Sequence, residues 1–278
     1  MLLNKKICFL GAGSIAEAMI AGILAKQILP AENITVINQS NKERIYQLVS
    51  TYHVKTALNK VETINQADML ILAIKPKDVA EALLEIKPFI HSKQLIISVI
   101  AGVTTDFISD TLQHKGPVIR TMPNTSSMIG LSATAMSPGK NAKAEDVQTA
   151  QQIMEAIGTV NLMEENLLDA VTGLSGSGPA YIYYLVEAME QAAVQLGMNK
   201  QTARELIVQT IIGAGHMLQQ TNEDPAILRE KVTSPGGSTM AGLETLRKFQ
   251  FQEAMNQAIK QATARSKELG QQFVEITS

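Results

Sequence analysis

The segment Gly11-Ala12-Gly13-Ser14-Ile15-Ala16 has small residues spaced as in loops that bind phosphate groups. It follows an apolar run at Ile7–Leu10 and opens a helical pattern. Between a strand and a helix, the first glycine of G-x-G-x-x-A permits a tight turn and the second lets the backbone approach a pyrophosphate, while the alanine lets helix and strand pack closely. The N–H groups at the helix start favour an anion. The segment predicts a dinucleotide site; the simpler alternative is an ordinary glycine turn.

The residues after the apolar run Ile34–Ile37 bear on which dinucleotide binds. An NAD site usually presents an acidic residue about 20 residues beyond the glycines, where it holds the ribose hydroxyls. This chain has Asn38-Gln39-Ser40-Asn41-Lys42 there, and its first carboxylate is Glu43. A carboxylate would repel a 2′-phosphate, whereas amides, a hydroxyl and the cation of Lys42 or Arg44 can accept it. The segment favours NADP(H) over NAD(H), unless these are loop residues that do not discriminate.

Four further segments contribute to the expected site. Ala73-Ile74-Lys75-Pro76 and Ser98-Val99-Ile100-Ala101-Gly102 end apolar runs, and ligands of open α/β sheets bind outside the carboxyl ends of the strands. Pro76 also suits the first turn of a helix for structural reasons alone. The glycine-rich segments 174–179 and 233–239 each precede a helical pattern, where exposed N–H groups could bind a substrate carboxylate. For either segment alone, a turn capped by Ser or Thr is the simpler explanation.

Other catalytic machinery is not apparent in the sequence. The four histidines are scattered and lie beside none of these motifs: His53, His91, His114 and His216. No His, Cys or Asp cluster has metal-ligand spacing, and no G-x-S-x-G elbow occurs. We therefore expect a reaction that needs neither a metal nor a strong dedicated base.

The amino-acid composition limits the classes of binding partner that this protein could have. The 278 residues include 24 Lys and Arg against 26 Asp and Glu, so a net charge of −2 offers no broad positive field for nucleic acid or an anionic membrane. Apolar stretches such as Met69–Ile74 are far shorter than the ~18 residues of a membrane-spanning helix. The single cysteine, Cys8, lies in an apolar run and is expected to be a small buried hydrophobe. We expect a cytoplasmic protein that acts on a small molecule.

Two domains must position these residues. Up to residue 163, short apolar runs alternate with helical patterns, which predicts an α/β Rossmann domain with a doubly wound, mostly parallel sheet. The runs are Ile7–Leu10, Ile34–Ile37, Met69–Ile74, Leu95–Val99 and Val118–Ile119. The helical patterns are Ser14–Leu29, Asn41–Ser50, Pro76–Ile86 and Thr104–Leu112. Residues 164–278 show helical periodicity throughout, which predicts an all-α domain.

Two helical segments of the second half lead to further predictions, one about a subunit interface and one about a solvent-exposed helix. The helix expected from Pro179 to Leu196 is apolar along two stripes, one containing Tyr184 and Leu185 and the other Ile182 and Met189. A helix with two apolar faces must be covered twice, so we expect an interface between subunits there. The last segment, Phe249 to Thr277, is expected to be a solvated amphipathic helix.

Five motifs together resemble the pyrroline-5-carboxylate reductase family. They are GAGSIAEAMI (11–20), AIKP (73–76), RTMPNT (120–125), VTGLSGSGPAY (171–181) and VTSPGGSTMAGL (232–243). They occur in family order and spacing; the last two are highly specific, and the first is shared with many dehydrogenases. The resemblance implies NAD(P)H as hydride donor and a C-terminal domain that interlocks with that of a partner in a homodimer, with a larger assembly left open. It implies reduction of 1-pyrroline-5-carboxylate to L-proline, the last step of proline biosynthesis.

The resemblance also implies site residues by position. The cofactor would be lined by Gly11, Ala12, Gly13, Ser14, Ile15, Asn38, Gln39, Asn59, Ala73, Ile74, Lys75, Pro76, Ala101 and Gly102. The substrate pocket would contain Glu165, Gly236, Gly237, Ser238 and Thr239. Family members often have Asn-Arg where this chain has Asn38-Gln39, so Lys42 or Arg44 would have to supply the cation for a 2′-phosphate.

A cyclic imine substrate would need no catalytic base, because its protonated form is already electrophilic. We expect the N–H groups of residues 236–239 to bind its carboxylate, and the Thr239 hydroxyl to hydrogen-bond its ring nitrogen. Two alternatives remain: reduction of another cyclic imine or a short hydroxy acid, and a non-catalytic NADP(H)-binding regulator on the same fold. A methyltransferase that binds S-adenosylmethionine at the glycine loop is disfavoured, because the second apolar run ends without an acidic ribose ligand.

Overall fold

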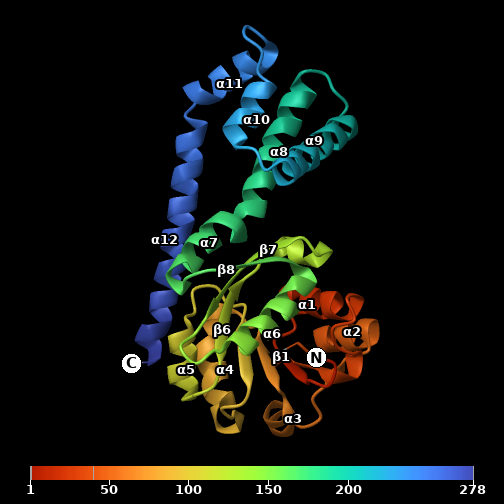
Figure 1. Cartoon of the computed structure of the whole chain (residues 1–278). Helices are drawn as coiled ribbons and strands as arrows, with labels where there is room; N and C mark the ends of the chain where they lie inside the picture. Colours follow the sequence, from red (N-terminus) through yellow and green to blue (C-terminus); the bar gives the residue numbers. More distant parts are fainter. Residues whose placement is uncertain (1, 40, 278) are drawn as a thin grey trace. The chain divides into compact units, whose positions relative to one another are not determined.

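The computed structural model describes residues 2–39 and 41–277, with side chains placed as far as Gln271. The chain forms two compact units (Figure 1). Unit 1 comprises Met1–Ser177 and Lys260–Ser278, and unit 2 comprises Gly178–Ile259. Residues Glu164–Ser177 and the end of the chain thus group with the α/β part, whereas the sequence places the change of pattern after residue 163.

Unit 1 is built on one eight-stranded sheet with the order β3-β2-β1-β4-β5-β6-β7-β8. The strands are β1 Ile7–Leu10, β2 Ile34–Ile37, β3 Lys55–Thr56, β4 Met69–Leu72, β5 Leu95–Ser98, β6 Val118–Met122, β7 Ser132–Pro138 and β8 Gly158–Leu162. Neighbours from β3 to β6 pair in parallel, β7 is antiparallel to β6, and β8 is parallel to β7. The expected doubly wound, mostly parallel fold is confirmed.

Helices cover both faces of this sheet (Figure 1). They are α1 Ser14–Ala25, α2 Lys42–Tyr52, α3 Lys60–Gln66, α4 Val79–Ile86, α5 Thr105–Leu112, α6 Ala144–Met154 and α7 Leu168–Val171. Short 3₁₀ turns are η1 Ala31–Asn33, η2 Pro76–Asp78, η3 Lys87–Phe89, η4 Thr125–Ile129, η5 Glu155–Ile157 and η6 Glu165–Leu167, and η7 Thr172–Gly176 is a π-helical turn.

The core of unit 1 divides at the sheet because successive strand residues point to opposite faces. In β1, Ile7 and Phe9 pack with buried residues of α1 and α6, whereas Cys8 and Leu10 pack with those of α4 and α5. Every residue of β1 is buried. Burial on both faces explains why the parallel strands appear in the sequence as continuous apolar runs.

Three strands are missing from the sequence-based prediction: β3, β7 and β8. Strand β7 has the sequence SATAMSP, yet it is mostly buried. Its polar side chains are satisfied locally, since the Ser132 hydroxyl accepts from the Asn124 N–H at 3.0 Å and lies 3.1 Å from the Thr134 hydroxyl. Hydroxyl side chains with such partners can be buried in a strand without an apolar run that would reveal them.

Unit 2 contains α8 Gly178–Gln195, α9 Lys200–Thr221, α10 Pro225–Lys231, α11 Ser238–Lys248 and the start of α12 Phe251–Thr277. Helices α8 and α9 pack together, and Arg204 of α9 forms a two-pronged ion pair with Glu190 of α8. From Glu165 onward the described residues form helices and turns, as expected. Within the part that the structure describes, no helix is long and apolar enough to cross a membrane.

Large apolar side chains of α8 are exposed in the isolated chain. Tyr184 is 75% exposed and Ile182 43% exposed, although they belong to different stripes of the helix. Further exposed apolar residues lie on α9, including Leu206, Ile212 and Met217. Surfaces of this kind mark protein interfaces, so the exposure agrees with the subunit interface expected on this helix.

The described residues of α12 are mostly exposed or half-buried, as expected of a solvated amphipathic helix, but Ser266 is buried. Ser266 is only 4% exposed, and its hydroxyl donates to Asp169 Oδ1 at 2.8 Å. Neighbouring Arg265 and Lys267 face solvent, as the amphipathic pattern suggests. A small hydroxyl residue gives no sequence signal for burial, because its partner is 97 positions away.

Cys8 is buried, as expected, and burial raises the pKa of its thiol to about 12. The reactive thiolate should therefore be almost absent at pH 8. We expect iodoacetamide at pH 8 to leave Cys8 unmodified in the native protein and to alkylate it fully in denaturant, as measured by mass spectrometry. Rapid alkylation of the native protein would contradict this packing.

Candidate functional site

The loop after β1 has the geometry of a phosphate cradle. Gly11 has φ +112°, its N–H donates to the Ile37 carbonyl at 2.8 Å, and an added Cβ would overlap the Ala73 carbonyl oxygen. At Gly13, by contrast, no atom lies within 4 Å of an added Cβ. Gly13 is also the N-cap of α1 and provides no side-chain cap, so the first N–H groups of the helix remain available for an anion.

The other segments expected to line the cofactor follow neighbouring strands. Asn38 and Gln39 follow β2, Asn59 follows β3, Ala73–Pro76 follow β4, and Ala101-Gly102 follow β5. Because β1 to β5 are parallel, the carboxyl ends of all these strands lie at the same edge of the sheet. The chain order reverses between β1 and β4, which places the glycine loop at the topological switch point. The structure thus brings the expected cofactor residues to one edge.

Local contacts show what shapes these segments. The Asn38 amide donates to the Asn41 carbonyl at 3.2 Å, and Asn59 caps α3 by accepting from the Glu62 N–H at 3.2 Å. Pro76 occupies the first turn of η2, with Lys75 as its N-cap. Ser40, whose hydroxyl the sequence offers to a 2′-phosphate, lies outside the described residues.

Arg44 is held against the glycine loop. Its Nε donates to the Ala12 carbonyl at 3.0 Å, and its Nη2 pairs with the Glu17 carboxylate. Tyr52 also donates to Glu17, and the pKa of the Tyr52 hydroxyl is raised by burial and by that carboxylate. Lys42 is exposed and pairs with none of the described residues. Of the two cations expected near a 2′-phosphate, Arg44 is therefore already engaged, whereas Lys42 has no partner among the described residues.

Glu165 belongs to a second polar cluster in unit 1. Its two carboxylate oxygens accept from the N–H and the hydroxyl of Thr105, each at 2.7 Å, at the start of α5. Arg120, only 2% exposed, reaches Glu165 at 3.7 Å and Asp169 at 3.0 Å. Sequence reasoning missed Arg120 and Asp169 as site-forming residues. The available signal was an arginine within the strand VIRTM, since a buried charge needs a partner.

Residues 236–239 lie in unit 2, where they form the start of α11. Gly236 has φ +70°, and Gly237 is the N-cap without a side-chain cap. The Gly237 N–H donates a hydrogen bond to the Ser234 carbonyl at 3.0 Å. Thr239 is exposed, and its hydroxyl makes no hydrogen bond with the described residues. The uncapped first turn and the Thr239 hydroxyl can therefore bind a small anion with a polar neighbour.

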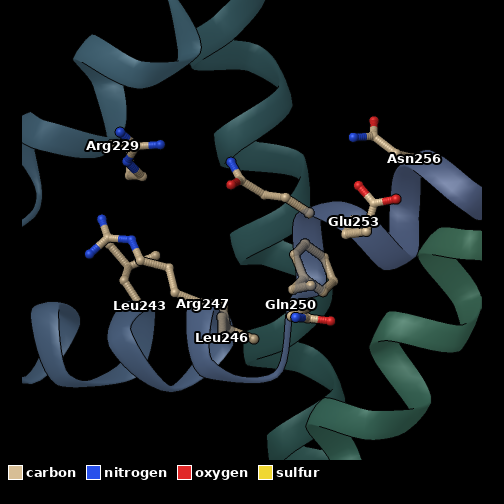
Figure 2. A pocket seen from close by; sticks show the side chains of 9 residues that line it. Arg229, Leu243, Leu246, Arg247, Gln250, Glu253 and Asn256 are labelled. Carbon is tan, nitrogen blue, oxygen red and sulfur yellow. The ribbon is translucent and has the colours of Figure 1, made fainter.

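A cavity of about 580 Å³ lies within unit 2 between α10, α11 and the start of α12 (Figure 2). Figure 2 shows Arg229 and Arg247 on one side and Glu253 and Asn256 on the other. The remaining lining residues are Leu243, Leu246, Gln250, Phe251 and Gln252. No residue expected to bind cofactor or substrate lines this cavity. Among the described residues, no group of three or more His, Cys, Asp or Glu could hold a metal.

A doubly wound sheet with an open G-x-G-x-x-A helix start at its switch point is the architecture of dinucleotide-binding proteins. Residues 6–102 match the family model described as NADP oxidoreductase, coenzyme F420-dependent, and residues 165–269 match pyrroline-5-carboxylate reductase dimerisation. The chain is 48% identical over 268 residues to pyrroline-5-carboxylate reductase 1 of Bacillus subtilis, covering 96% of this chain and 90% of the relative. The chain belongs to the pyrroline-5-carboxylate reductase family, which confirms the resemblance seen in its motifs.

Solved structures agree with this assignment. The pyrroline-5-carboxylate reductase of Coxiella burnetii is 33% identical, with a TM-score of 0.88 over 96% of this chain and 98% of that one. A Plasmodium falciparum pyrroline carboxylate reductase with NADP bound is 27% identical, with a TM-score of 0.87 over the same shares. The dimerisation match supports a homodimer, and it spans the helices with exposed apolar faces.

Proposed function

We propose that this protein reduces 1-pyrroline-5-carboxylate to L-proline with NADPH as the preferred hydride donor, the last step of proline biosynthesis. The observation that carries the proposal is the alignment of five parallel strand ends, with the open glycine loop at the switch point, in a chain of this family. The nicotinamide cofactor supplies the hydride when bound. The chain's own residues have to bind the two reactants, orient them and provide a hydrogen bond to the imine.

The described residues fit the cofactor. Open space beside Gly13 lets the backbone approach a pyrophosphate, and the uncapped start of α1 offers N–H donors to it. We assign the rest of the cofactor to the segments at the same edge: Ala12, Ser14, Ile15, Asn38, Gln39, Asn59, Ala73–Pro76 and Ala101-Gly102. Asn38 and Gln39 place neutral amides at the end of β2, where an NAD site usually has a carboxylate.

The substrate residues in this proposal are Glu165 and Gly236–Thr239. The N–H groups at the start of α11 bind the carboxylate, and the Thr239 hydroxyl hydrogen-bonds the ring nitrogen in its protonated form or supplies its proton. The free Thr239 hydroxyl supports this role. Glu165 already accepts two hydrogen bonds from Thr105, but each carboxylate oxygen keeps a further lone pair for a donor on the substrate.

NADP(H) preference depends on Lys42 in this proposal, because Arg44 is engaged by Glu17. We expect Lys42→Ala to raise the KM for NADPH by up to about fivefold, the effect of losing an exposed ion pair, and to leave the KM for NADH unchanged. Steady-state kinetics with both cofactors measures this. Lys93→Ala is the matched control, because Lys93 precedes β5 at the opposite edge of the sheet. Equal changes with NADPH and NADH would refute the contact with the 2′-phosphate.

The activity itself is tested by following NADPH and NADH oxidation with pyrroline-5-carboxylate and with its six-membered homologue. We expect turnover of the five-membered imine and lower kcat/KM for the homologue. Failure with both imines and both cofactors would overturn the proposal. Assembly beyond the homodimer is left open, and a location in the cytoplasm stays a prediction.

A further inference from the structure

The end of helix α12 lies against the loop that follows β5. A Cβ added to Gly270 would overlap the carbonyl oxygen of Gly102, and one added to Gly102 would lie 3.1 Å from the Ser266 carbonyl. Gly102 also has φ +77°, a conformation that favours glycine. The backbones of loop and helix can therefore approach this closely only because both contact positions lack a side chain.

Buried polar contacts fix α12 in this position. Ser266, one turn before Gly270, donates to Asp169 Oδ1 at 2.8 Å, and the same oxygen accepts from Arg120 Nη2 at 3.0 Å. Arg120 and Ser266 are 2% and 4% exposed. A hydrogen bond to an ionised acceptor is shorter and stronger than one between neutral groups, so the bond from Ser266 to Asp169 sets the position of the helix along its axis.

The same cluster also holds the other end of the loop. Arg120 lies 3.7 Å from Glu165, whose carboxylate accepts from the N–H and hydroxyl of Thr105. Residues 101–105 are thus fixed at Gly102 by α12 and at Thr105 by Glu165. Both supports converge on Arg120, which comes from the neighbouring strand β6.

We propose that Gly270 and Ser266 are positioning residues for the cofactor site. They hold the loop 101–105 where Ala101 and Gly102 can contact the cofactor, and so they set its affinity without touching it. This inference rests on the proposed function, in which Ala101-Gly102 line the cofactor. It gives the C-terminal helix a part in cofactor binding, although Ser266 and Gly270 lie more than 150 residues after that loop in the sequence.

The test is Gly270→Ala, which inserts one methyl group between helix and loop. Alanine favours a helix over glycine, so a loss cannot come from a weaker α12. We expect the Kd and KM for NADPH to rise about tenfold, because the methyl group displaces a loop that contacts the cofactor. The kcat at saturating NADPH and the KM for the imine should stay within about twofold of the wild-type values. Fluorescence titration gives Kd, and steady-state kinetics gives the split between KM and kcat.

Two variants on the same helix complete the test. Lys267→Ala changes an exposed side chain beside Ser266 that pairs with none of the described residues, and it should leave the Kd for NADPH unchanged. Ser266→Ala removes the hydrogen bond to Asp169 without adding bulk, and it should raise the Kd by about threefold, the effect of one modest hydrogen bond. Ser266→Thr, which keeps the hydroxyl, should restore part of that affinity.

The outcomes separate the two proposals. If the wild-type protein neither binds NADPH nor reduces the imine, the proposed function fails and this inference fails with it. If the wild-type protein does both, but folded Gly270→Ala and Ser266→Ala bind NADPH as the wild type does, only this inference is overturned. Should Gly270→Ala not fold, Ser266→Ala decides alone, and an unchanged Kd in that variant overturns the inference.

Discussion

A Gly11→Ala variant is expected to lose both NADPH-dependent imine reduction and a substantial part of its folding stability. The added Cβ would overlap the Ala73 carbonyl oxygen, and alanine is strained at φ +112°. Strain and overpacking of this kind each cost ~1–3 kcal/mol, so the free energy of unfolding should fall by about 2–6 kcal/mol. Displacement of the glycine loop should reduce kcat/KM for NADPH by a factor on the order of 10² or more. Denaturant unfolding and steady-state kinetics measure the two effects.

Gly13→Ala is the matched control for that prediction. Gly13 has φ −74°, and nothing lies within 4 Å of an added Cβ, so alanine should leave the free energy of unfolding within about 0.5 kcal/mol of wild type. The methyl group would instead occupy the space where a pyrophosphate approaches, and the affinity for NADPH should fall. Normal binding of NADPH by Gly13→Ala would show that the pyrophosphate does not approach the backbone at Gly13. If Gly11→Ala were as stable as wild type, the tight approach to Ala73 would not constrain the fold.

A Thr239→Ala variant should reduce imine turnover on the order of 10²-fold in kcat/KM, with little change in the affinity for NADPH. The reason is the loss of an oriented hydrogen bond to the ring nitrogen as the imine is reduced. Stability should not change, because Thr239 is exposed near the start of α11 and alanine is a good helix former. Steady-state kinetics with the imine, together with NADPH titration, separates the reaction step from cofactor binding.

Thr239→Ser and Ser238→Ala refine this second prediction. Serine keeps the hydroxyl and should retain most of the activity. Ser238→Ala leaves the backbone N–H groups of the turn in place and should change kcat/KM by less than about tenfold, since it removes only a neighbouring hydroxyl. Full kcat/KM in Thr239→Ala would exclude the proposed role of this residue.

The central parallel strands β2, β1, β4, β5 and β6 could be predicted from the sequence, whereas β3, β7 and β8 could not. The apolar runs Ile7–Leu10 and Ile34–Ile37 coincide with β1 and β2 residue for residue. The first is buried throughout and the second on alternate residues, so burial required apolar side chains that the sequence displays. Strand β8 has only half-buried and exposed residues at the edge of the sheet, and β7 buries hydroxyl groups that neighbouring groups satisfy. Neither produces an apolar pattern.

That the expected cofactor segments share one edge of the sheet was predictable from the sequence for a related reason. Each expected segment immediately follows a strand of a parallel sheet, and parallel strands deliver their carboxyl ends to one edge whatever their order. The expected substrate residues could not be grouped in this way, because Glu165 lies in unit 1 and Gly236–Thr239 lie in unit 2. No local pattern connects two such segments, and their common role was inferred from the family resemblance.

Short-range patterns of size, charge and hydrophobicity were enough to predict the class of fold, the glycine loop, the family and the strand ends expected to line the cofactor. Three sets of contacts could be found only in the folded chain: Arg44 is held by Glu17, Arg120 and Asp169 form a buried pair, and Ser266 and Gly270 meet the loop at Gly102. Those contacts join residues 27 to 168 positions apart, the extremes being Arg44 with Glu17 and Gly270 with Gly102 (270 minus 102). They arise from the order of the strands and the path of α12, which no local stretch of sequence encodes.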